Sequence, residues 1–200
     1  MMTERMGGRP RNFETDAVLE RALDLFWRDG YGSTSLQALL CHMGISRQSL
    51  YNTFGDKRSL FLAALTRYME RASERLAVLE QEDASLPAIY EFFGGLGGEP
   101  SAGSEPKRCC MVGRICMELG GPDDDVALAV QQFFARTNAA FEHALTNALG
   151  KGEVADLEAR DVAVHLTGTL HGLGMMRRAG VPMDDLRRAV RVSLSVLEAR

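Results

Sequence analysis

Apolar residues recur at intervals of three and four along most of the chain, which is the spacing of an amphipathic α-helix. The first such segment runs from Phe13 to Asp29, and Gly30 stands where that helix would stop. Its apolar positions are Val18, Leu19, Ala22, Leu25 and Phe26. No stretch alternates apolar and polar residues as a half-buried strand does. The pattern therefore predicts an all-α protein.

Two short helices are predicted next, on either side of a tight corner. Residues 36–42 carry a stripe of leucines at helical spacing, and either Thr34 or Ser35 precedes them as the N-cap. Residues 43–45 form the corner, and Ser46 is placed to cap the helix that follows. A helix, a short glycine-containing turn and a second helix make the helix-turn-helix arrangement. With the first helix they form a compact three-helix head.

The third predicted helix, within Gly44–Asp56, has an unusual polar face. Leu50 and Phe54 are four residues apart, so both face the interior. The residues left toward solvent are Arg47, Gln48, Ser49, Tyr51, Asn52 and Thr53. Arginine, glutamine and asparagine pair bidentately with base edges in the major groove, while a tyrosine hydroxyl suits a phosphate oxygen. This composition predicts a helix that reads DNA.

The run from Tyr31 to Phe61, YGSTSLQALLCHMGISRQSLYNTFGDKRSLF, resembles the N-terminal domain of TetR-type bacterial transcriptional regulators. The preceding GGRPR resembles their basic arm. The resemblance implies phosphate contacts by Thr34, Tyr51 and Lys57, and base contacts by Arg47, Gln48 and Asn52. Leu40 and Met43 stand where alanine is usual in that family, and Gln48 stands where a small residue is common. These departures concern the DNA sequence that the protein recognises and not its fold.

The distribution of charge matters more than the net charge of −4. Residues 1–60 contain eight Lys and Arg against seven Asp and Glu, whereas residues 61–200 contain 15 against 20. The acidity therefore lies in the larger part of the chain, and DNA binding should depend on salt. The basic N-terminal residues form either a solvated tail or a minor-groove arm that orders on binding. The predicted DNA-binding set is Arg9, Arg11, Thr34, Ser46, Arg47, Gln48, Ser49, Tyr51, Asn52 and Lys57.

The rest of the chain reads as helix almost throughout. The predicted segments are 57–81, 86–96, 109–119, 123–149, 157–179 and 183–199, with a Gly-, Ser- and Pro-rich stretch at 97–106. We expect residues 1–56 to be the helix-turn-helix DNA-binding domain with its basic arm. Residues 57–200 then form a helical effector-binding and dimerisation domain, joined to the head by the long helix at 57–81.

Two long C-terminal helices are what a symmetric homodimer needs, because paired helices from each subunit form a four-helix bundle. The resemblance implies the same. Gly168, Gly172 and Gly174 either let another helix approach closely or loosen their own helix around a cavity. In a dimer, two reading helices one DNA turn apart, about 34–36 Å, read a palindromic operator in double-stranded DNA.

The body also offers adaptable apolar surface with a few polar points, which suits a small-molecule effector. The predicted ligand-binding residues are Phe92, Phe93, Cys110, Met111, Phe133, Phe134, His171 and Met175. Ligand binding that favours a tilted 57–81 helix would change the spacing of the heads and release the operator. His165 and His171 are six residues apart and do not share a helix face, so no metal site is expected from them.

A cysteine-based trigger is the alternative. The segment KRCCMVGRICMELG resembles a Gly-Cys-Leu stretch in one branch of TetR-type regulators, in which Cys110 matches and Cys109 replaces the glycine. Lys107, Arg108 and a helix N-terminus would each favour the thiolate form. Redox or electrophile sensing through Cys109, Cys110 and Cys116 therefore stands beside ordinary packing of these residues as small hydrophobes.

Other classes of protein find less support. The sequence has no GxSxG, P-loop or HExxH motif, and its glycine-rich residues 94–98 follow a helix, so no catalytic residue or cofactor is expected. No run of some 18 apolar residues could span a bilayer, and the N-terminus lacks the apolar core of a secretion signal. Four cysteines in a chain of this size fit a reducing compartment better than a disulfide scaffold. We therefore expect a cytoplasmic location. An unfamiliar enzyme and a protein-binding head remain the alternatives to a regulator.

Overall fold

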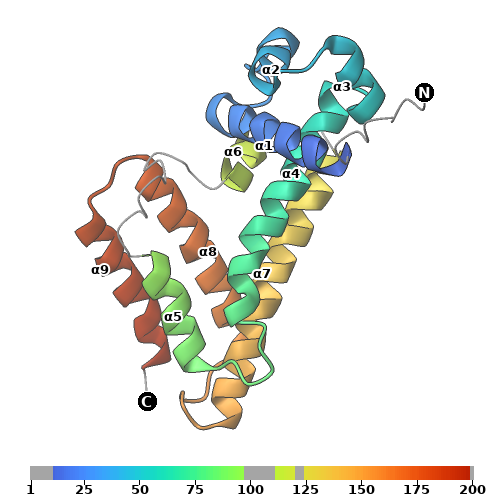
Figure 1. The fold of residues 1–200 in the computed structure, drawn as a ribbon. Helices are drawn as coiled ribbons and strands as arrows, with labels where there is room; N and C mark the ends of the chain where they lie inside the picture. Colours follow the sequence, from blue (N-terminus) through green and yellow to red (C-terminus); the bar gives the residue numbers. More distant parts are fainter. Residues whose placement is uncertain (1–10, 97–110, 120–123, 199–200) are drawn as a thin grey trace, which may run out of the picture. The chain divides into compact units, whose positions relative to one another are not determined.

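The computed structural model describes residues 11–96, 111–119 and 124–198, and every regular element in these ranges is a helix (Figure 1). The prediction of an all-α protein is therefore confirmed. The chain divides into two compact units, of which the first ends at Tyr68 and the second begins at Met69.

The first unit contains the predicted head. Its elements are α1 (Arg11–Asp29), α2 (Leu36–Met43), α3 (Arg47–Phe54) and the first turns of α4 (Lys57–Glu74). α1 stops at Gly30, whose φ of 89° lies in the left-handed region and whose N–H donates to the Phe26 carbonyl at 2.9 Å. α3 lies within the segment that the sequence pattern assigned to it, whereas α2 continues one residue beyond the predicted 36–42, to Met43.

An aromatic cluster holds α4 to α1 in this unit. The rings of Phe26 and Phe61 meet edge to face with centroids 5.2 Å apart. The centroid of the Tyr31 ring lies 4.7 Å from that of Phe61. Both phenylalanines are almost completely buried. The Lys57 ammonium lies 4.3 Å from the centroid of the Tyr31 ring and also donates to the Tyr31 carbonyl at 2.6 Å. The start of α4 is thereby fixed against the turn that follows α1.

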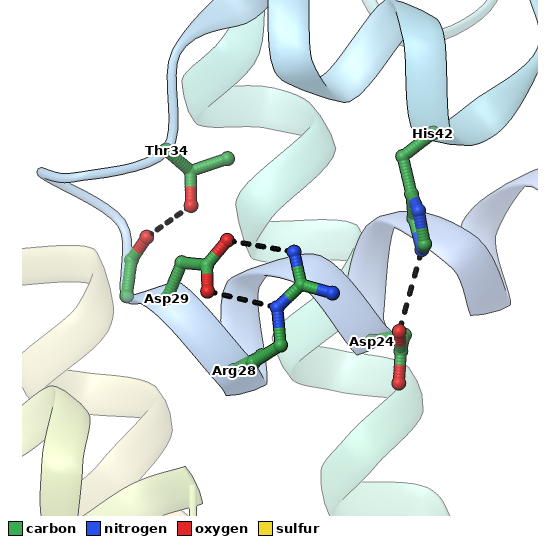
Figure 2. A network of polar contacts seen from close by, with 6 residues as sticks. Asp24, Arg28, Asp29, Thr34 and His42 are labelled. Carbon is green, nitrogen blue, oxygen red and sulfur yellow. Dashed lines mark hydrogen bonds and ion pairs between the residues drawn. The ribbon is translucent and has the colours of Figure 1, made fainter.

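α1 also braces the C-terminal end of α2. The Arg21 guanidinium donates to the carbonyl of Met43 at 2.7 Å, and His42 Nε2 lies 3.3 Å from the Asp24 carboxylate. Figure 2 shows the Asp24–His42 contact and also the Thr34 hydroxyl, which donates to the Gly30 carbonyl, with the Arg28–Asp29 pair drawn between them. A cation at the last carbonyls of a helix is favourable because those groups carry the negative end of the helix dipole.

The second unit is built around α7 (Asp124–Gly150), a helix of 27 residues. α8 (Ala159–Arg178) returns antiparallel to α7 after a short turn, and α9 (Met183–Leu194) packs on α8 (Figure 1). α5 (Leu86–Leu96) and α6 (Met111–Leu119) also pack on α7. The interior combines residues of α5, α7, α8 and α9, including Ile89, Phe93, Phe141, Leu166 and Leu194.

Two predicted helices are shorter than the sequence pattern suggested. The segment at 57–81 ends as α-helix at Glu74 and continues as a 3-10 turn, η1 (Arg75–Val78). The last helix ends at Leu194 and tightens into η2 (Ser195–Leu197). In a 3-10 turn side chains three residues apart lie above one another. This geometry lets Leu76 and Leu79 both be buried, and likewise Leu194 and Leu197.

A polar stripe on α7 holds the loop that joins η1 to α5. Arg136 makes two hydrogen bonds to the Glu80 carboxylate, at 2.8 and 3.0 Å. His143 Nε2 lies 2.8 Å from the Gln81 carbonyl, and Asn147 donates to the carbonyls of Glu82 and Ala84. These α7 residues are spaced by seven and four, so one face of the helix makes all the contacts. The Arg136 hydrogen bonds lower the pKa of Glu80 from its ordinary value.

No helix in the described ranges is long and apolar enough to cross a membrane.

We predict that Gly44→Ala destabilises the protein by about 1–2 kcal/mol, because Gly44 has a φ of +69° and an L side chain is strained in that region. The measurement is urea unfolding followed by circular dichroism. Gly94→Ala is the matched control, because Gly94 lies within α5 and an added Cβ would meet nothing within 4 Å. That change should stabilise by up to about 1 kcal/mol through helix propensity. Equal effects of both substitutions would contradict the prediction.

Candidate DNA-binding interface

Both short helices of the head are capped by serines. Ser46 Oγ accepts a hydrogen bond from the Ser49 N–H at 3.1 Å, as predicted for the start of α3. At the start of α2 the cap is Ser35, which accepts from the Ala38 N–H at 3.1 Å, so the choice between Thr34 and Ser35 is decided. Gly44 ends α2 in the left-handed conformation and turns the chain into α3.

α3 buries one side of its eight residues and exposes the other. Leu50 is completely buried, whereas Phe54 is only half-buried. The exposed residues are Arg47, Gln48, Ser49, Tyr51, Asn52 and Thr53. Within the described part of the chain, the side chains of Arg47, Gln48 and Asn52 make no hydrogen bond or ion pair. Their donors and acceptors are therefore directed outward and are available to a ligand.

Thr34 and Lys57 differ from the other predicted contacts. Thr34 is 2% exposed and its hydroxyl is bonded to the Gly30 carbonyl, so its side chain organises the corner between α1 and α2. Lys57 is half-buried against Tyr31. Arg9 lies outside the described residues, and Arg11 is the first residue of α1.

The junction between α3 and α4 is fixed by Asp56. Its carboxylate accepts a hydrogen bond from the backbone N–H of Ser59 at 2.7 Å. This bond lowers the pKa of Asp56 from its ordinary value, with a smaller contribution from Arg58. Gly55, with a φ of +86°, supplies the turn that precedes it. The ionised carboxylate therefore serves α4 as an N-terminal cap.

Sequence reasoning missed the contribution of Arg21 to this interface. Its partner is the Met43 carbonyl, 22 residues away, at the end of α2. No pattern of side chains indicates a bond to a distant backbone carbonyl, so the sequence held no signal for it.

The predicted ligand-binding residues of the body do not form one group. Phe92 and Phe93 pack with Phe141 as ordinary core, with ring centroids 5.4 and 5.7 Å from the Phe141 ring. Met111, at the start of α6, is 1% exposed. Met175 is 48% exposed on α8, so it does not line the interior of the single chain. Cys110 lies outside the described residues.

Phe133, Phe134 and His171 do come together. The His171 ring meets Phe134 edge to face with centroids 4.7 Å apart, and Phe133 lies 5.8 Å away. Burial lowers the pKa of His171 to about 4 from its ordinary 6.5, because the charged imidazolium is poorly solvated there. His171 is therefore neutral at pH 7. Cys116, on α6, is half-buried.

Comparison with known proteins supplies the context for this geometry. The model of the family described as bacterial regulatory proteins, tetR family, matches residues 18–64, which span α2, α3 and parts of α1 and α4. The chain is 35% identical over 196 residues to YezE, an uncharacterized HTH-type transcriptional regulator of Bacillus subtilis (strain 168). That match covers 96% of this chain and 100% of YezE.

The protein belongs to the TetR family of transcriptional regulators. It is a DNA-binding regulator and not an enzyme. It is also similar to ComR, an HTH-type transcriptional repressor of Escherichia coli (strain K12), with 28% identity over 190 residues, 94% of this chain and 90% of ComR. A solved structure of the TetR-family regulator CifR, a cysteine mutant bound to 26-bp double-strand operator DNA, matches with a TM-score of 0.74 and 29% identity. The match covers 96% of this chain and 99% of CifR.

We predict that the stability of this regulator falls by about 2 kcal/mol between pH 7 and pH 5 because of His171. Its pKa is about 4 in the folded protein and near 6.5 in the unfolded chain, so the unfolded chain takes up the proton as pH falls below 6.5. Urea unfolding across that pH range measures the effect. His171→Leu should remove this part of the dependence. His165→Leu, at an exposed position of the same helix, is the control and should retain it.

Proposed function

We propose that this TetR-family regulator is a homodimeric repressor whose α3 helices read a palindromic operator, and that a small-molecule effector releases it from DNA. In this proposal residues 1–56 bind DNA and residues 57–200 bind the effector and dimerise. The observation that carries the DNA-binding part is the outward polar face of α3, whose arginine, glutamine and asparagine are not used within the described chain. CifR and ComR, as an operator-bound regulator and a repressor, support the same role.

α3 divides its exposed residues between two tasks. Arg47, Gln48 and Asn52 carry the side-chain groups that pair with base edges, and we assign base reading to them. Tyr51 is 48% exposed and its hydroxyl suits a phosphate oxygen. Thr34 is buried, so we assign it to the corner of the head and not to DNA.

An exposed apolar stripe on α8 and α9 supports the dimer. Val164 on α8 is 54% exposed and Val192 on α9 is 73% exposed. An added Cβ at Gly168 or Gly172 would meet nothing within 4 Å, so the backbone of α8 is open to close approach there. Isolated exposed apolar residues are ordinary, but a stripe of them beside open glycines on two packed helices suits a partner helix.

The two helices present this stripe at one level. The Thr169 hydroxyl donates to Ser193 at 3.3 Å across the contact between α8 and α9. Gly168 and Val192 are the chain neighbours of these two residues, so they lie at the same height on adjacent helices. We therefore propose that α8 and α9 pair with their copies in a second subunit as a four-helix bundle.

Effector release requires that the body and α4 move together. The loop between η1 and α5 is held to α7 by Arg136, His143 and Asn147. A ligand that shifts α7 would therefore pull on the end of α4, and α4 begins at Lys57 in the head. The free energy by which the effector weakens DNA binding cannot exceed the difference between its binding free energies for the shifted and unshifted states.

The second candidate trigger is cysteine chemistry at Cys109, Cys110 and Cys116. Cys116 is half-buried on α6, a helix that packs on α7. The CifR structures bound to operator DNA are of cysteine mutants. An oxidant that releases DNA in the absence of any small molecule would favour this trigger over a non-covalent effector.

We predict that the proposed DNA-contacting residues of α3 and Lys57 of α4 separate into two classes when tested on an operator selected from random duplexes. Gln48→Ala and Asn52→Ala should lose roughly 1–3 kcal/mol of preference at particular base pairs. Tyr51→Phe and Lys57→Ala should weaken binding to all sequences alike. Fluorescence anisotropy between 50 and 200 mM salt measures both properties. Because Lys57 also holds Tyr31, its variant is checked by thermal unfolding.

Arg160→Ala is the control for this series, since it removes an exposed positive charge from α8 and not from α3. Its affinity and selectivity should equal those of the unchanged protein. Equal losses of selectivity in all four α3 and α4 variants would contradict the assignment.

We predict that Gly168→Trp and Val192→Asp each raise the dimer dissociation constant at least about tenfold. The first blocks the approach of a helix, and the second places a carboxylate in a buried apolar contact, which costs more than the roughly 1.4 kcal/mol that a tenfold change requires. Sedimentation equilibrium measures the change. Gly95→Trp is the control, because a Cβ at Gly95 in α5 also meets nothing within 4 Å. A dimer that survives both substitutions would place the interface elsewhere.

A further inference from the structure

Among the described residues of the body, two side chains each have a buried oxygen atom without a hydrogen-bond partner. They are Asn138 on α7 and Thr167 on α8. Neither the Asn138 Oδ1 nor the Thr167 Oγ1 reaches solvent, and Thr167 as a whole is 5% exposed. Buried polar groups in folded proteins are nearly always hydrogen-bonded, and each exception calls for an explanation. Because these two exceptions lie on helices that pack together, we look for one explanation of both.

Thr167 departs from the usual way in which a helical threonine is satisfied. Thr137, on α7, is also completely buried, and its hydroxyl donates to the Phe133 carbonyl one turn earlier at 3.0 Å. Thr146 bonds the Glu142 carbonyl in the same manner at 2.8 Å. Thr167 makes no such bond to its own helix, so its hydroxyl is available to a group outside it.

Helix geometry brings Asn138 and Thr167 to the same place. Phe134 on α7 contacts His171 on α8, with ring centroids 4.7 Å apart. Asn138 is one turn after Phe134 and Thr167 is one turn before His171, so each shares a helix face with its partner in this contact. Because α7 and α8 run antiparallel, one turn forward on α7 lies beside one turn back on α8 (Figure 1). The two polar atoms therefore lie next to the aromatic contact.

The chemistry of this cluster selects a class of ligand. Phe133 and Phe134 offer apolar ring surface, whereas Asn138 and Thr167 offer an acceptor and a hydroxyl. His171 adds an imidazole that is neutral at pH 7 because burial lowers its pKa to about 4. None of these five side chains carries a charge, so an ion would lose its hydration without gaining a counter-charge from them. An uncharged molecule with an apolar body and one hydrogen-bonding group fits.

We infer that Asn138 and Thr167 bind the polar group of the effector, an uncharged, largely apolar molecule with a hydroxyl or amide, between α7 and α8 beside Phe134 and His171. This inference rests on the proposed effector-responsive function and assigns its binding residues. It also separates the eight residues predicted from the sequence, because Phe133, Phe134 and His171 line the site while Phe92 and Phe93 belong to the core.

The inference is tested by direct binding of three probes to the complete protein without DNA. Benzyl alcohol has a ring and a hydroxyl, toluene has the ring alone, and benzoate carries a charge. Isothermal titration calorimetry should show benzyl alcohol binding at least about tenfold more tightly than toluene, with benzoate weakest. A site that hydrogen-bonds a hydroxyl discriminates against the analogue that lacks it. Equal binding of benzyl alcohol and toluene, or no binding of either, would overturn the inference.

Variants of Asn138 and Thr167 test whether these two residues cause the preference for benzyl alcohol over toluene. Thr167→Val and Asn138→Leu should each reduce the preference for benzyl alcohol over toluene at least about threefold, and the double variant should abolish it. Thr146→Val is the matched control, because its hydroxyl is already bonded to Glu142, and it should keep the full preference. If Thr167→Val and Asn138→Leu raise the melting temperature but leave the preference unchanged, the two polar atoms bind trapped water and the inference fails.

The same proteins distinguish this inference from the proposed function. Calorimetry without DNA reports on the site alone, whereas anisotropy with operator DNA reports on release. Probe binding that depends on Asn138 and Thr167 but leaves operator affinity unchanged would keep the site and remove its role as the effector site. Absence of operator binding would contradict the proposed function and leave the calorimetric result standing.

Discussion

The head depends on holding a helix that is too short to be stable alone. α3 has eight residues, fewer than an isolated helix needs in water, so its conformation is supplied by tertiary contacts. The burial of Leu50, the Ser46 cap and the left-handed Gly44 supply them. Because these few contacts hold α3, its exposed polar side chains are not needed for folding and can contact DNA in the proposed function. In that proposal, binding specificity comes from a surface that contributes little to folding.

In the body, one long helix, α7, holds a polar loop and several other helices. Different faces of α7 serve different neighbours. One face contributes Phe141 and Ala144 to the interior, and a second carries Arg136, His143 and Asn147 to the loop before α5. A third brings Phe134 against His171 of α8. A displacement of α7 would therefore change the packing of the core, the contacts of the loop that follows α4 and the contact with α8.

Head and body also differ in how completely their polar groups are satisfied. In the head, Arg21, Thr34, Lys57 and Asp56 are bonded to backbone groups, which fixes the positions of α2, α3 and α4. In the body, Asn138 and Thr167 are buried without a partner. Buried unpaired atoms raise the energy of a folded state and leave it open to stabilisation by a ligand. This contrast suits the proposed function, in which the head reads DNA and the body binds an effector.

The sequence by itself determined the helices, the Ser46 cap, the stop at Gly30 and the polar face of α3, because helical periodicity and capping depend on residues within one or two turns. It placed α5 at the observed bounds and located the corner of the head. Only the tertiary structure decided that α4 tightens into η1, that Thr34 is buried, that Met175 faces outward and that Arg21 bonds Met43. It alone separated Phe92 and Phe93 from His171, since the partners of a buried side chain come from helices far away in the chain. Those partners are set by the packing of whole helices, which no local pattern contains.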